Sequence, residues 1–454
     1  MLRRWVRGGR GPEDGLILRW MEAAAAKDSG EGRIVVMKFG GTSVAGSEEI
    51  KRAAGRIVAA REQGNRVVAV LSARGKTTDE LVEAAYEISE RPDPREMDML
   101  LSTGERVSCA LCAMAIHDMG HHAISLTGSQ AGIVTDSSHT KARIMEVKAD
   151  RIQEALEDEK IVLVAGFQGV STESRDVTTL GRGGSDTTAV AIAAALGASV
   201  CEIYTDVTGV FSADPRIVPD AKKLPVVSYE EMLEMSAAGA KVLQLRSVEY
   251  ARNNDVPIHC RSSFEDVPGT LVLPESETME RPIVTAVTHS TGESRVTVVG
   301  VRDEPGVAGR IFGALAEANV NVDVIIQNEP VGDDALADLS FTVDRDDLQT
   351  AVEVIEGLGE ISNSIRTDEQ IGKVSIVGAG MRSHPGVAAK VFEVMGEKRI
   401  NIEMISTSPI KISCVIQADR VPDAVAGLHA AFDLGAEATF PEDPTGEHRP
   451  TVRP

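Results

Sequence analysis

Residues 33–43, Arg-Ile-Val-Val-Met-Lys-Phe-Gly-Gly-Thr-Ser, decide how the rest of the chain is interpreted. The apolar, β-branched run 34–37 predicts a strand buried on both faces, as in a parallel sheet. Lys38 and the Gly40-Gly41 turn follow it, and a helical pattern begins at about Ser47, a plausible N-cap. Ligands of open α/β sheets bind at this edge, where glycines let backbone N–H groups approach an anion. The stretch therefore predicts an anion site or an ordinary strand–turn–helix, and both alternatives stay open.

Length and composition limit the class of protein. The 454 residues suggest two to four domains, and alternating helical and strand patterns favour an α/β fold. A net charge of −22 argues against nonspecific binding to nucleic acid or to anionic membranes. The five scattered cysteines suggest neither a disulfide framework nor a zinc site, which favours a cytoplasmic location. The longest apolar stretch, residues 188–200, is too short to span a bilayer.

A second apolar run, residues 67–71, leads into the hydroxyl- and glycine-rich loop 72–79. Its Gly75-Lys76-Thr77 imitates the end of a Walker A loop, but Val70 stands where that motif needs glycine. The loop predicts either a site for a small polar ligand or a capped helix start at Thr78 or Asp79.

The loop 178–188 has the richest chemistry. It contains three glycines, Arg182, and a Ser185-Asp186-Thr187-Thr188 cluster that opens an alanine-rich helix ending near Gly197. A helix N-terminus favours an anion, and a guanidinium suits a carboxylate or phosphate. Asp186 occupies the third glycine position of a dinucleotide fingerprint, which excludes that motif. The alternative is a glycine-rich helix cap without a ligand.

Other chemically suggestive residues lie between these loops. A long helix is predicted over residues 99–119, and the ordinary interpretation of its Glu105-Arg106 is a solvated face or an ion pair. A strand over residues 200–205 ends at Asp206, a turn follows at 210–216, and Lys241 is expected inside a helix.

The last third of the chain contains an internal repeat. Residues 305–325 align without a gap with residues 385–405, at a shift of 80. Each copy has the pattern strand, loop, Pro-Gly, helix, strand, strand. The repeat predicts two small α+β modules and not a solenoid.

Together, the motifs 38–43, 72–79, 104–108, 181–188 and 204–207 and the paired modules resemble the aspartate kinases of the amino-acid-kinase family, over about residues 33–440. The resemblance implies a three-layer α/β/α domain with a mostly parallel sheet, then two ferredoxin-like α+β modules similar to ACT domains. The expected division is a disordered extension 1–32, a catalytic domain 33–278, a first module 294–365, a second module 279–293 with 366–440, and a tail 441–454.

This resemblance implies transfer of the γ-phosphoryl of ATP, with Mg²⁺, to the β-carboxylate of L-aspartate, the first step of lysine, threonine and methionine biosynthesis. A carboxylate is ionised at neutral pH, so catalysis rests on positioning and charge neutralisation. The implied catalytic residues are Lys38, Gly41 and Asp206. Of these, Asp206 would orient either Mg²⁺ or the side chain of Lys38. Substrate residues would be Ser72, Thr78, Glu105 for the ammonium, Arg182 for the α-carboxylate, Gly183 and Ser185. Nucleotide residues would be Lys38, Phe39, Gly40, Gly41, Ser43, Tyr204, Thr205, Val210, Phe211, Ser212, Ala213, Asp214, Pro215 and Lys241.

The two modules are expected to bind feedback amino acids, with lysine and threonine as candidates. The implied residues are Asp303, Gly306, Val307, Ala308, Asn321 and Gln327, then Ser383, His384, Pro385, Gly386, Val387, Asn401, Ile402 and Glu403. A homo-oligomer formed through these modules is expected, and a separate regulatory subunit stays open.

Three other functions share features with this sequence. One is a kinase for glutamate, acetylglutamate, carbamate or a nucleoside monophosphate, but the Ser72 loop and Glu105-Arg106 favour an amino acid with a free ammonium. A second is an amino-acid-binding regulator with an inactive kinase domain, which intact Lys38, Arg182 and Asp206 oppose. A dehydrogenase interpretation of Gly378-Ala-Gly380 fails, because Ser383 stands where the last glycine belongs.

Overall fold

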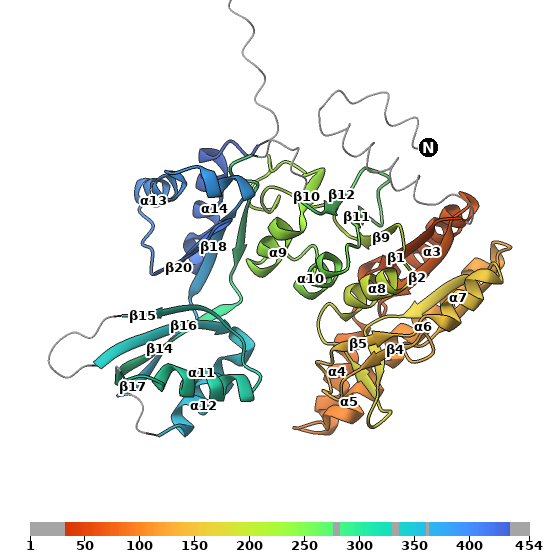
Figure 1. The fold of residues 1–454 in the computed structure, drawn as a ribbon, viewed down its shortest axis with the longest axis horizontal. Helices are drawn as coiled ribbons and strands as arrows, with labels where there is room; N and C mark the ends of the chain where they lie inside the picture. Colours follow the sequence, from red (N-terminus) through yellow and green to blue (C-terminus); the bar gives the residue numbers. More distant parts are fainter. Residues whose placement is uncertain (1–31, 276–281, 303, 329–335, 360–362, 436–454) are drawn as a thin grey trace, which may run out of the picture.

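The structure, a computed structural model, describes residues 32–275, 282–302, 304–328, 336–359 and 363–435 (Figure 1). The expected tail 441–454 and all but the last residue of the expected extension 1–32 lie outside the described residues, as does Asp303. The rest forms a large α/β domain and two smaller α+β modules, which lie to one side of it in Figure 1.

An eight-stranded sheet forms the centre of the large domain. Its strands are β1 (Ile34–Phe39), β2 (Arg66–Leu71), β3 (Ala123–Leu126), β6 (Ile161–Ala165), β9 (Val200–Thr205), β10 (Val226–Ser228), β11 (Ile258–Ser262) and β12 (Thr270–Leu273). They lie in the order β10-β12-β11-β9-β1-β2-β6-β3, and every neighbouring pair is parallel except β11 with β12. The strand predicted first, β1, thus lies in the interior of the sheet.

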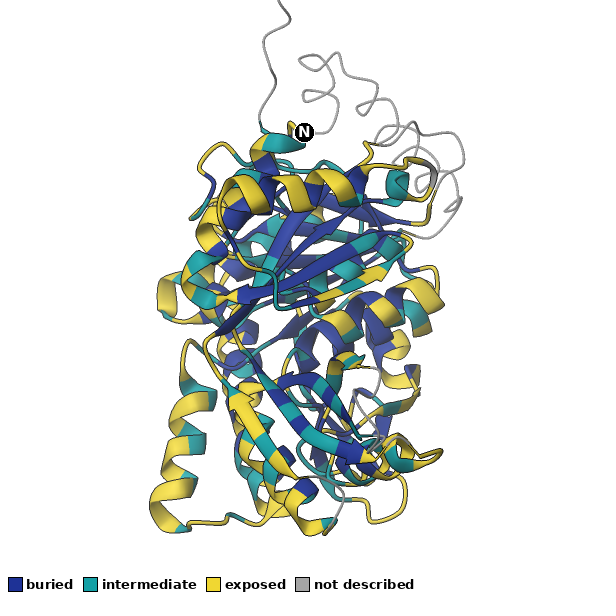
Figure 2. Ribbon diagram, turned by 90° about the vertical axis from the view of Figure 1, so that its left-hand side faces the viewer, coloured by how far each residue is buried: buried dark blue, intermediate teal, exposed yellow. Residues whose placement is uncertain are grey.

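Helices cover both faces of this sheet. On one face lie α3 (Ser47–Glu62) and α6 (Thr103–Asp118), and on the other α7 (Asp150–Glu157), α8 (Gly184–Ala195), α9 (Tyr229–Ala237) and α10 (Leu245–Asn253). Figure 2 shows the strands as dark-blue buried bands between helices with yellow outer faces. The expected three-layer fold with a mostly parallel sheet is confirmed.

The alternation of β1 directs its side chains to the two layers. Val35 and Met37 pack with α3 and α6, whereas Val36 packs in the core that contains α8. Since successive side chains of a strand point to opposite faces, Lys38 shares the face of Val36 and points toward α8.

A smaller sheet and two helices lie beside the carboxyl edge of the large sheet. Its strands β4 (Ile133–Thr135), β5 (Ile144–Val147), β7 (Gln168–Ser171) and β8 (Val177–Thr179) have the order β5-β4-β7-β8. The helices are α4 (Thr77–Ile88) and α5 (Pro94–Leu101), and α5 contacts β8. The loop with Arg182 joins β8 to α8.

The two modules share the sequence strand, helix, strand, strand, helix; the fourth strand of the sheet follows it in the first module and precedes it in the second. The first contains β14 (Glu293–Arg302), α11 (Val307–Glu317), β15 (Val322–Gln327), β16 (Leu336–Asp344), α12 (Leu348–Gly357) and β17 (Ser364–Asp368), with sheet order β15-β16-β14-β17. The second contains β13 (Ala286–Ser290), β18 (Ile371–Val377), α13 (Val387–Glu397), β19 (Met404–Ser408), β20 (Lys411–Gln417) and α14 (Val421–Ala431), with order β13-β18-β20-β19. Short 3₁₀ helices are η1 (Gly41–Val44), η2 (Arg345–Asp347), η3 (Ala379–Ser383) and η4 (Ala418–Arg420).

Three local expectations were wrong. The predicted helix over 99–119 is two helices, α5 and α6, which meet at Ser102. Gly46, not Ser47, is the N-cap of α3. Lys241 lies in the turn between α9 and α10, because Gly239 adopts φ +106° against the carbonyl of His289 and ends the helix there.

In the described part of the chain, one helical run, Pro94–Asp118, is long and apolar enough by composition to cross a membrane. It also carries the buried side chains of Asp98 and Glu105, and its second half packs against α3 and β6. Packing inside the domain therefore accounts for its apolar residues.

Candidate active site

The side chain of Lys38 leaves β1 toward the first turn of α8 and meets a carboxylate there. Its Nζ lies 2.5 Å from Oδ1 of Asp186, and the two side chains are 12% and 8% exposed. The sequence pattern marks Asp186 only as part of the polar cluster that opens the helix and as a departure from a dinucleotide motif, so it does not predict this pairing. The available signal was a lone acid in the first turn of a helix that follows a glycine-rich loop.

The Gly40-Gly41 turn is held between two neighbouring strand ends. The Gly40 N–H donates to the carbonyl of Tyr204 at 3.3 Å, and the Gly75 N–H donates to the carbonyl of Gly41 at 3.0 Å. A Cβ on Gly41 would lie 3.0 Å from the carbonyl oxygen of Ala73. Glycine at this position therefore lets the loops after β1 and β2 come together.

Glu105 projects from α6 toward the loop after β2. Its Oε1 accepts the backbone N–H of Ala73 at 3.1 Å, while its Oε2 has no hydrogen-bond partner within the described residues. The residue is buried, and this desolvation raises the pKa of its carboxyl to about 7. Arg106 instead donates to Ser102 at 3.1 Å, so the described structure has no Glu105–Arg106 ion pair. An unpartnered buried carboxylate oxygen of this kind suits an incoming ammonium group.

Arg182 is exposed on the loop between β8 and α8. Gly181 and Gly183 on either side of it both have φ +74°. Arg246 of α10 donates to the carbonyls of Leu180 at 2.6 Å and Ala142 at 3.0 Å, which fixes the loop backbone. The Arg182 guanidinium itself contacts no acid among the described residues, so it is available to an anion.

Three predicted substrate hydroxyls lie around these charges. Ser72 follows β2, Thr78 lies in the first turn of α4, and Ser185 lies in the first turn of α8. A Cβ on Gly166 would lie 2.7 Å from the Ser185 hydroxyl, which therefore faces the end of β6. Within the described residues none of the three hydroxyls is hydrogen-bonded, so each can serve a ligand.

Two of the three aromatic residues on the predicted nucleotide side, Phe39 and Tyr204, belong to the core. The rings of Phe39 and Tyr204 are buried and stack with centroids 4.7 Å apart. The Tyr204 hydroxyl donates to Glu202 at 2.9 Å. Only the backbone of these two residues can therefore face a nucleotide. Asp206, just after β9, is exposed and accepts from Thr205 at 3.0 Å, whereas the partner of Lys38 is Asp186.

The predicted nucleotide turn 210–215 is divided between two cores. Val210 packs in the core of the large domain, and Ala213 packs in the core of the second module. The buried Ser212 hydroxyl bonds to His429 of α14 and to the carbonyl of Leu434, both at 3.0 Å. The Ser212 and Ala213 side chains therefore join the domain to the module.

The predicted regulatory residues gather at equivalent positions in the two modules. Gly306 and Gly386 are the N-caps of α11 and α13, with φ +97° and +100°, and a Cβ on either would meet nothing within 4 Å. The remaining residues adjoin these helix starts or the strands that follow, namely Val307, Ala308, Asn321, Gln327, His384, Pro385, Val387, Asn401 and Ile402. The Ser383 side chain is outside the described residues.

Glu403 has a partner between the modules. Its Oε2 lies 2.6 Å from Arg295 of β14, which also pairs with Asp368 at 3.1 Å. Lys373 of β18 similarly pairs with Glu293 of β14 at 2.6 Å. These bridges tie the two sheets together.

Comparison with known proteins gives consistent findings for both parts. The amino acid kinase family matches residues 33–262, and the ACT domain matches residues 296–357 and 374–432. Over 408 residues, 89% of this chain and 97% of each relative, identity is 55% with the aspartokinase of Mycobacterium tuberculosis and 52% with that of Corynebacterium glutamicum. The structure of Escherichia coli aspartokinase III in complex with aspartate and ADP covers 88% of this chain and 99% of its own, with a TM-score of 0.76 and 26% identity.

Proposed function

The chain belongs to the amino acid kinase family, and we propose that it transfers the γ-phosphoryl of ATP to the β-carboxylate of L-aspartate. The products are ADP and 4-phospho-L-aspartate, at the first step of lysine, threonine and methionine biosynthesis. Identity of 55% to an aspartokinase over 97% of its length supports this assignment. The structural observation that carries it is the placement of three charged residues: Lys38 lies at the end of β1, Glu105 of α6 contacts the loop after β2, and Arg182 lies on the loop that enters α8, whose Asp186 pairs with Lys38.

The charges of these groups match those of the substrates. ATP and aspartate are both anions, and the chain carries a net charge of −22, so local cations are needed. We assign Lys38 to the phosphoryl group in flight, Arg182 to the α-carboxylate and Glu105 to the ammonium. The hydroxyls of Ser72, Thr78 and Ser185 would donate to the reacting side chain. The acceptor carboxylate is already ionised at neutral pH and needs no general base.

The residues at this edge also fit a magnesium ion. Mg²⁺ is usually held by one or two carboxylates together with substrate phosphates, and the exposed carboxylate of Asp206 lies directly after β9. When bound with ATP, the ion would neutralise phosphate charge, and Asp206 would hold it.

A panel assay tests the substrate. ADP release is followed with aspartate, glutamate, N-acetylglutamate and carbamate, each at increasing concentration with ATP and Mg²⁺. Saturable turnover with aspartate in preference to the others is expected. If only another acid is turned over, that acid is the substrate and the proposal of aspartate is wrong. Amino-acid binding without any turnover would favour the rival function, a regulator with an inactive kinase domain.

We propose feedback inhibition at the helix starts of the modules. The ACT matches support it, as does the structure of E. coli aspartokinase III in complex with lysine and aspartate, with a TM-score of 0.67 and 26% identity. At α11, N–H groups and the helix dipole would attract the carboxylate of lysine or threonine. The open space beside Gly306 leaves room for that group.

Gly306→Asp is expected to weaken inhibition by about tenfold or more, since allosteric coupling is typically about 1–3 kcal/mol. The new side chain puts bulk and negative charge where the effector carboxylate would lie. Basal activity should stay within about twofold. Inhibition curves with lysine, threonine and their mixture are compared at fixed aspartate. Gly359→Asp is the matched control for backbone strain, because Gly359 follows α12 of the same module, has φ +77° and would also carry a Cβ with nothing within 4 Å. If the inhibition curves of Gly306→Asp equal those of the parent, the effector does not bind at the first module.

We also propose a homo-oligomer built through the modules. The strands β15 and β19 are sheet edges, and Ile325 and Ile405, which are equivalent in the repeat, are 50% and 43% exposed on them. An exposed apolar edge strand is a template for pairing with another chain. A regulatory subunit consisting of the modules alone would pair in the same way.

Ile325→Lys is expected to lower the mass measured by light scattering, because a charge on the edge opposes pairing. Ile88→Lys, on the exposed end of α4 (Ile88 is 89% exposed), should leave the mass unchanged. Equal masses for parent and Ile325→Lys would contradict an interface at β15.

We infer that the enzyme works in the cytoplasm. All five cysteines are free and buried, as expected in a reducing compartment.

A further inference from the structure

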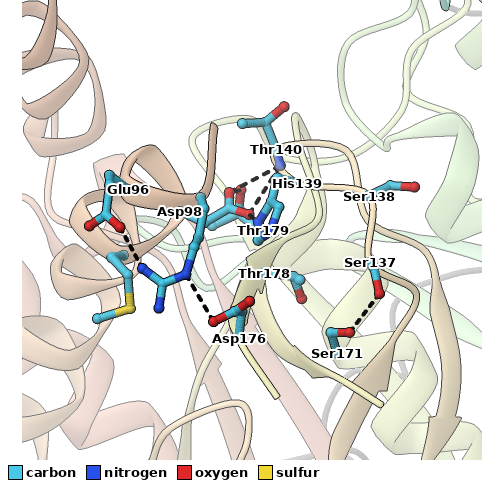
Figure 3. Close-up of polar contacts among 12 residues, drawn as sticks. Glu96, Asp98, Ser137, Ser138, His139, Thr140, Ser171, Asp176, Thr178 and Thr179 are labelled. Carbon is cyan, nitrogen blue, oxygen red and sulfur yellow. Dashed lines mark hydrogen bonds and ion pairs between the residues drawn. The ribbon is translucent and has the colours of Figure 1, made fainter. Parts of the chain in front are cut away.

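A buried carboxylate that the proposed chemistry does not use lies near the Arg182 loop. Asp98 of α5 is fully buried, and both of its oxygens accept hydrogen bonds (Figure 3). Nδ1 of His139 lies 2.7 Å away, the Thr179 hydroxyl donates at 2.5 Å, and the Thr140 N–H is 3.1 Å from each oxygen. A buried charge with this many donors fixes the relative positions of the segments that supply them.

The segments that donate to Asp98 are close to Arg182 in the sequence or packed against its loop. Thr179 is the last residue of β8, three residues before Arg182. The Thr179 carbonyl also accepts the Ala142 N–H at 2.9 Å. A Cβ on Gly181 would lie 3.1 Å from the Thr140 carbonyl oxygen, so the loop runs closely past the segment that Asp98 holds.

Asp98 is also connected to Glu105, because α5, which carries Asp98, is followed directly by α6, which carries Glu105. α5 joins α6 at Ser102, whose carbonyl accepts the side-chain amide of Gln168 at 2.9 Å. Gln168 is the β-ladder partner of Thr179. The junction of α5 and α6 is thus attached twice to one ladder position, through Asp98 and through Ser102. These links set Glu105 on α6 at a fixed distance from the loop with Arg182.

From this geometry we propose that Asp98, with His139, is a positioning residue for amino-acid selection. In this proposal Asp98 fixes the distance between Glu105, which would bind the substrate ammonium, and Arg182, which would bind the α-carboxylate. That distance would suit aspartate. This inference rests on the proposed function of Glu105 and Arg182. Asp98 itself is fully buried, so we assign it no contact with the substrate.

Asp98→Asn is the direct test, because it keeps the shape of the side chain and removes its charge. We expect KM for aspartate to rise about tenfold and KM for ATP to stay within about twofold, since small misplacements at a site can cost up to about 10²-fold. The preference for aspartate over glutamate should also fall. Asp176→Asn is the matched control. Asp176 pairs with Arg95 of α5 at 2.9 Å and precedes β8, but does not touch the Arg182 loop.

A pair of substitutions at His139 keeps the test decisive if Asp98→Asn does not fold. His139→Asn retains an N–H donor near the position of Nδ1 and should behave like the parent. His139→Leu removes the donor and should raise KM for aspartate alone. Equal rises in KM for both substrates, an unchanged aspartate preference, or equal behaviour of the two His139 variants would overturn the proposal. Absence of aspartate turnover in the parent would instead refute the proposed function, and this inference with it.

Discussion

Replacing Lys38 by alanine is expected to lower kcat by about 10²–10³, the usual effect of removing one preorganised electrostatic group. The reason is the position of the ammonium at the carboxyl end of β1, beside the Gly40-Gly41 turn and the first turn of α8. There it would meet the charge that develops on the phosphoryl group. The rate of ADP release at saturating ATP and aspartate measures the effect, and turnover equal to that of the parent would remove Lys38 from catalysis.

The ion pair with Asp186 makes a second effect of this substitution predictable. From sequence alone a ligand-pocket lysine is expected to change fold stability little. Lys38→Ala, however, leaves the Asp186 carboxylate, on a side chain only 8% exposed, without its counter-charge. Removing one partner of a buried pair typically costs about 3–5 kcal/mol of unfolding free energy. A lower melting temperature is therefore expected, and kcat has to be measured well below it.

A double variant separates the two effects. Lys38→Ala combined with Asp186→Ala removes both charges, so the melting temperature should recover toward that of the parent. If Lys38 acts on the phosphoryl group, kcat should stay low in the double variant. Recovery of kcat together with stability would mean that Lys38 only neutralises Asp186.

The features that sequence predicted correctly depend on local patterns. The β-branched run of β1, the glycine turn after it and the repeat at a shift of 80 residues follow from neighbouring residues, and the structure has the corresponding elements at those positions. The two-residue period of a strand even fixes the face on which Lys38 lies. Local patterns also identified Arg182 as a candidate anion ligand, whereas the role of Glu105 came only from the family resemblance.

What sequence did not predict depends on contacts between distant segments. The Lys38–Asp186 pair requires α8 to lie over β1, and the Ser212–His429 contact requires the second module to pack against the large domain. Lys241 was misplaced because the backbone at Gly239 is set by a contact with His289 of β13, a strand of the second module's sheet. No periodicity near these residues carries that information.

Glu105→Gln is expected to raise KM for aspartate by about 10–10², since a hydrogen bond to a charged group contributes about 1.5–3 kcal/mol. The substitution keeps the size of the side chain and an acceptor for the Ala73 N–H, but removes the negative charge that would face the substrate ammonium. KM for ATP should change by less than about threefold. Arg106→Gln is the control, because Arg106 bonds to Ser102 at the start of the same helix. Equal changes in both KM values for Glu105→Gln would make Glu105 a structural residue.

The raised pKa of Glu105 adds a pH dependence that only the parent should show. Burial raises this pKa from 4.5 to about 7 in the free protein, so the carboxyl is largely neutral below pH 7 and charged above it. Only the charged form can pair with an ammonium, so kcat/KM for aspartate should fall as the pH falls through about 7, and it should be nearly flat there in Glu105→Gln. The contribution of Glu105 to the free energy of unfolding changes with pH in the opposite direction to the activity. The folded state binds this proton more tightly than the unfolded state, so the group's contribution to stability is lost as the pH rises from 4.5 through about 7. Glu105→Gln should therefore lose less stability than the parent over this range. A parent whose kcat/KM for aspartate is as flat as that of the variant would show that Glu105 does not bind the ammonium as a carboxylate.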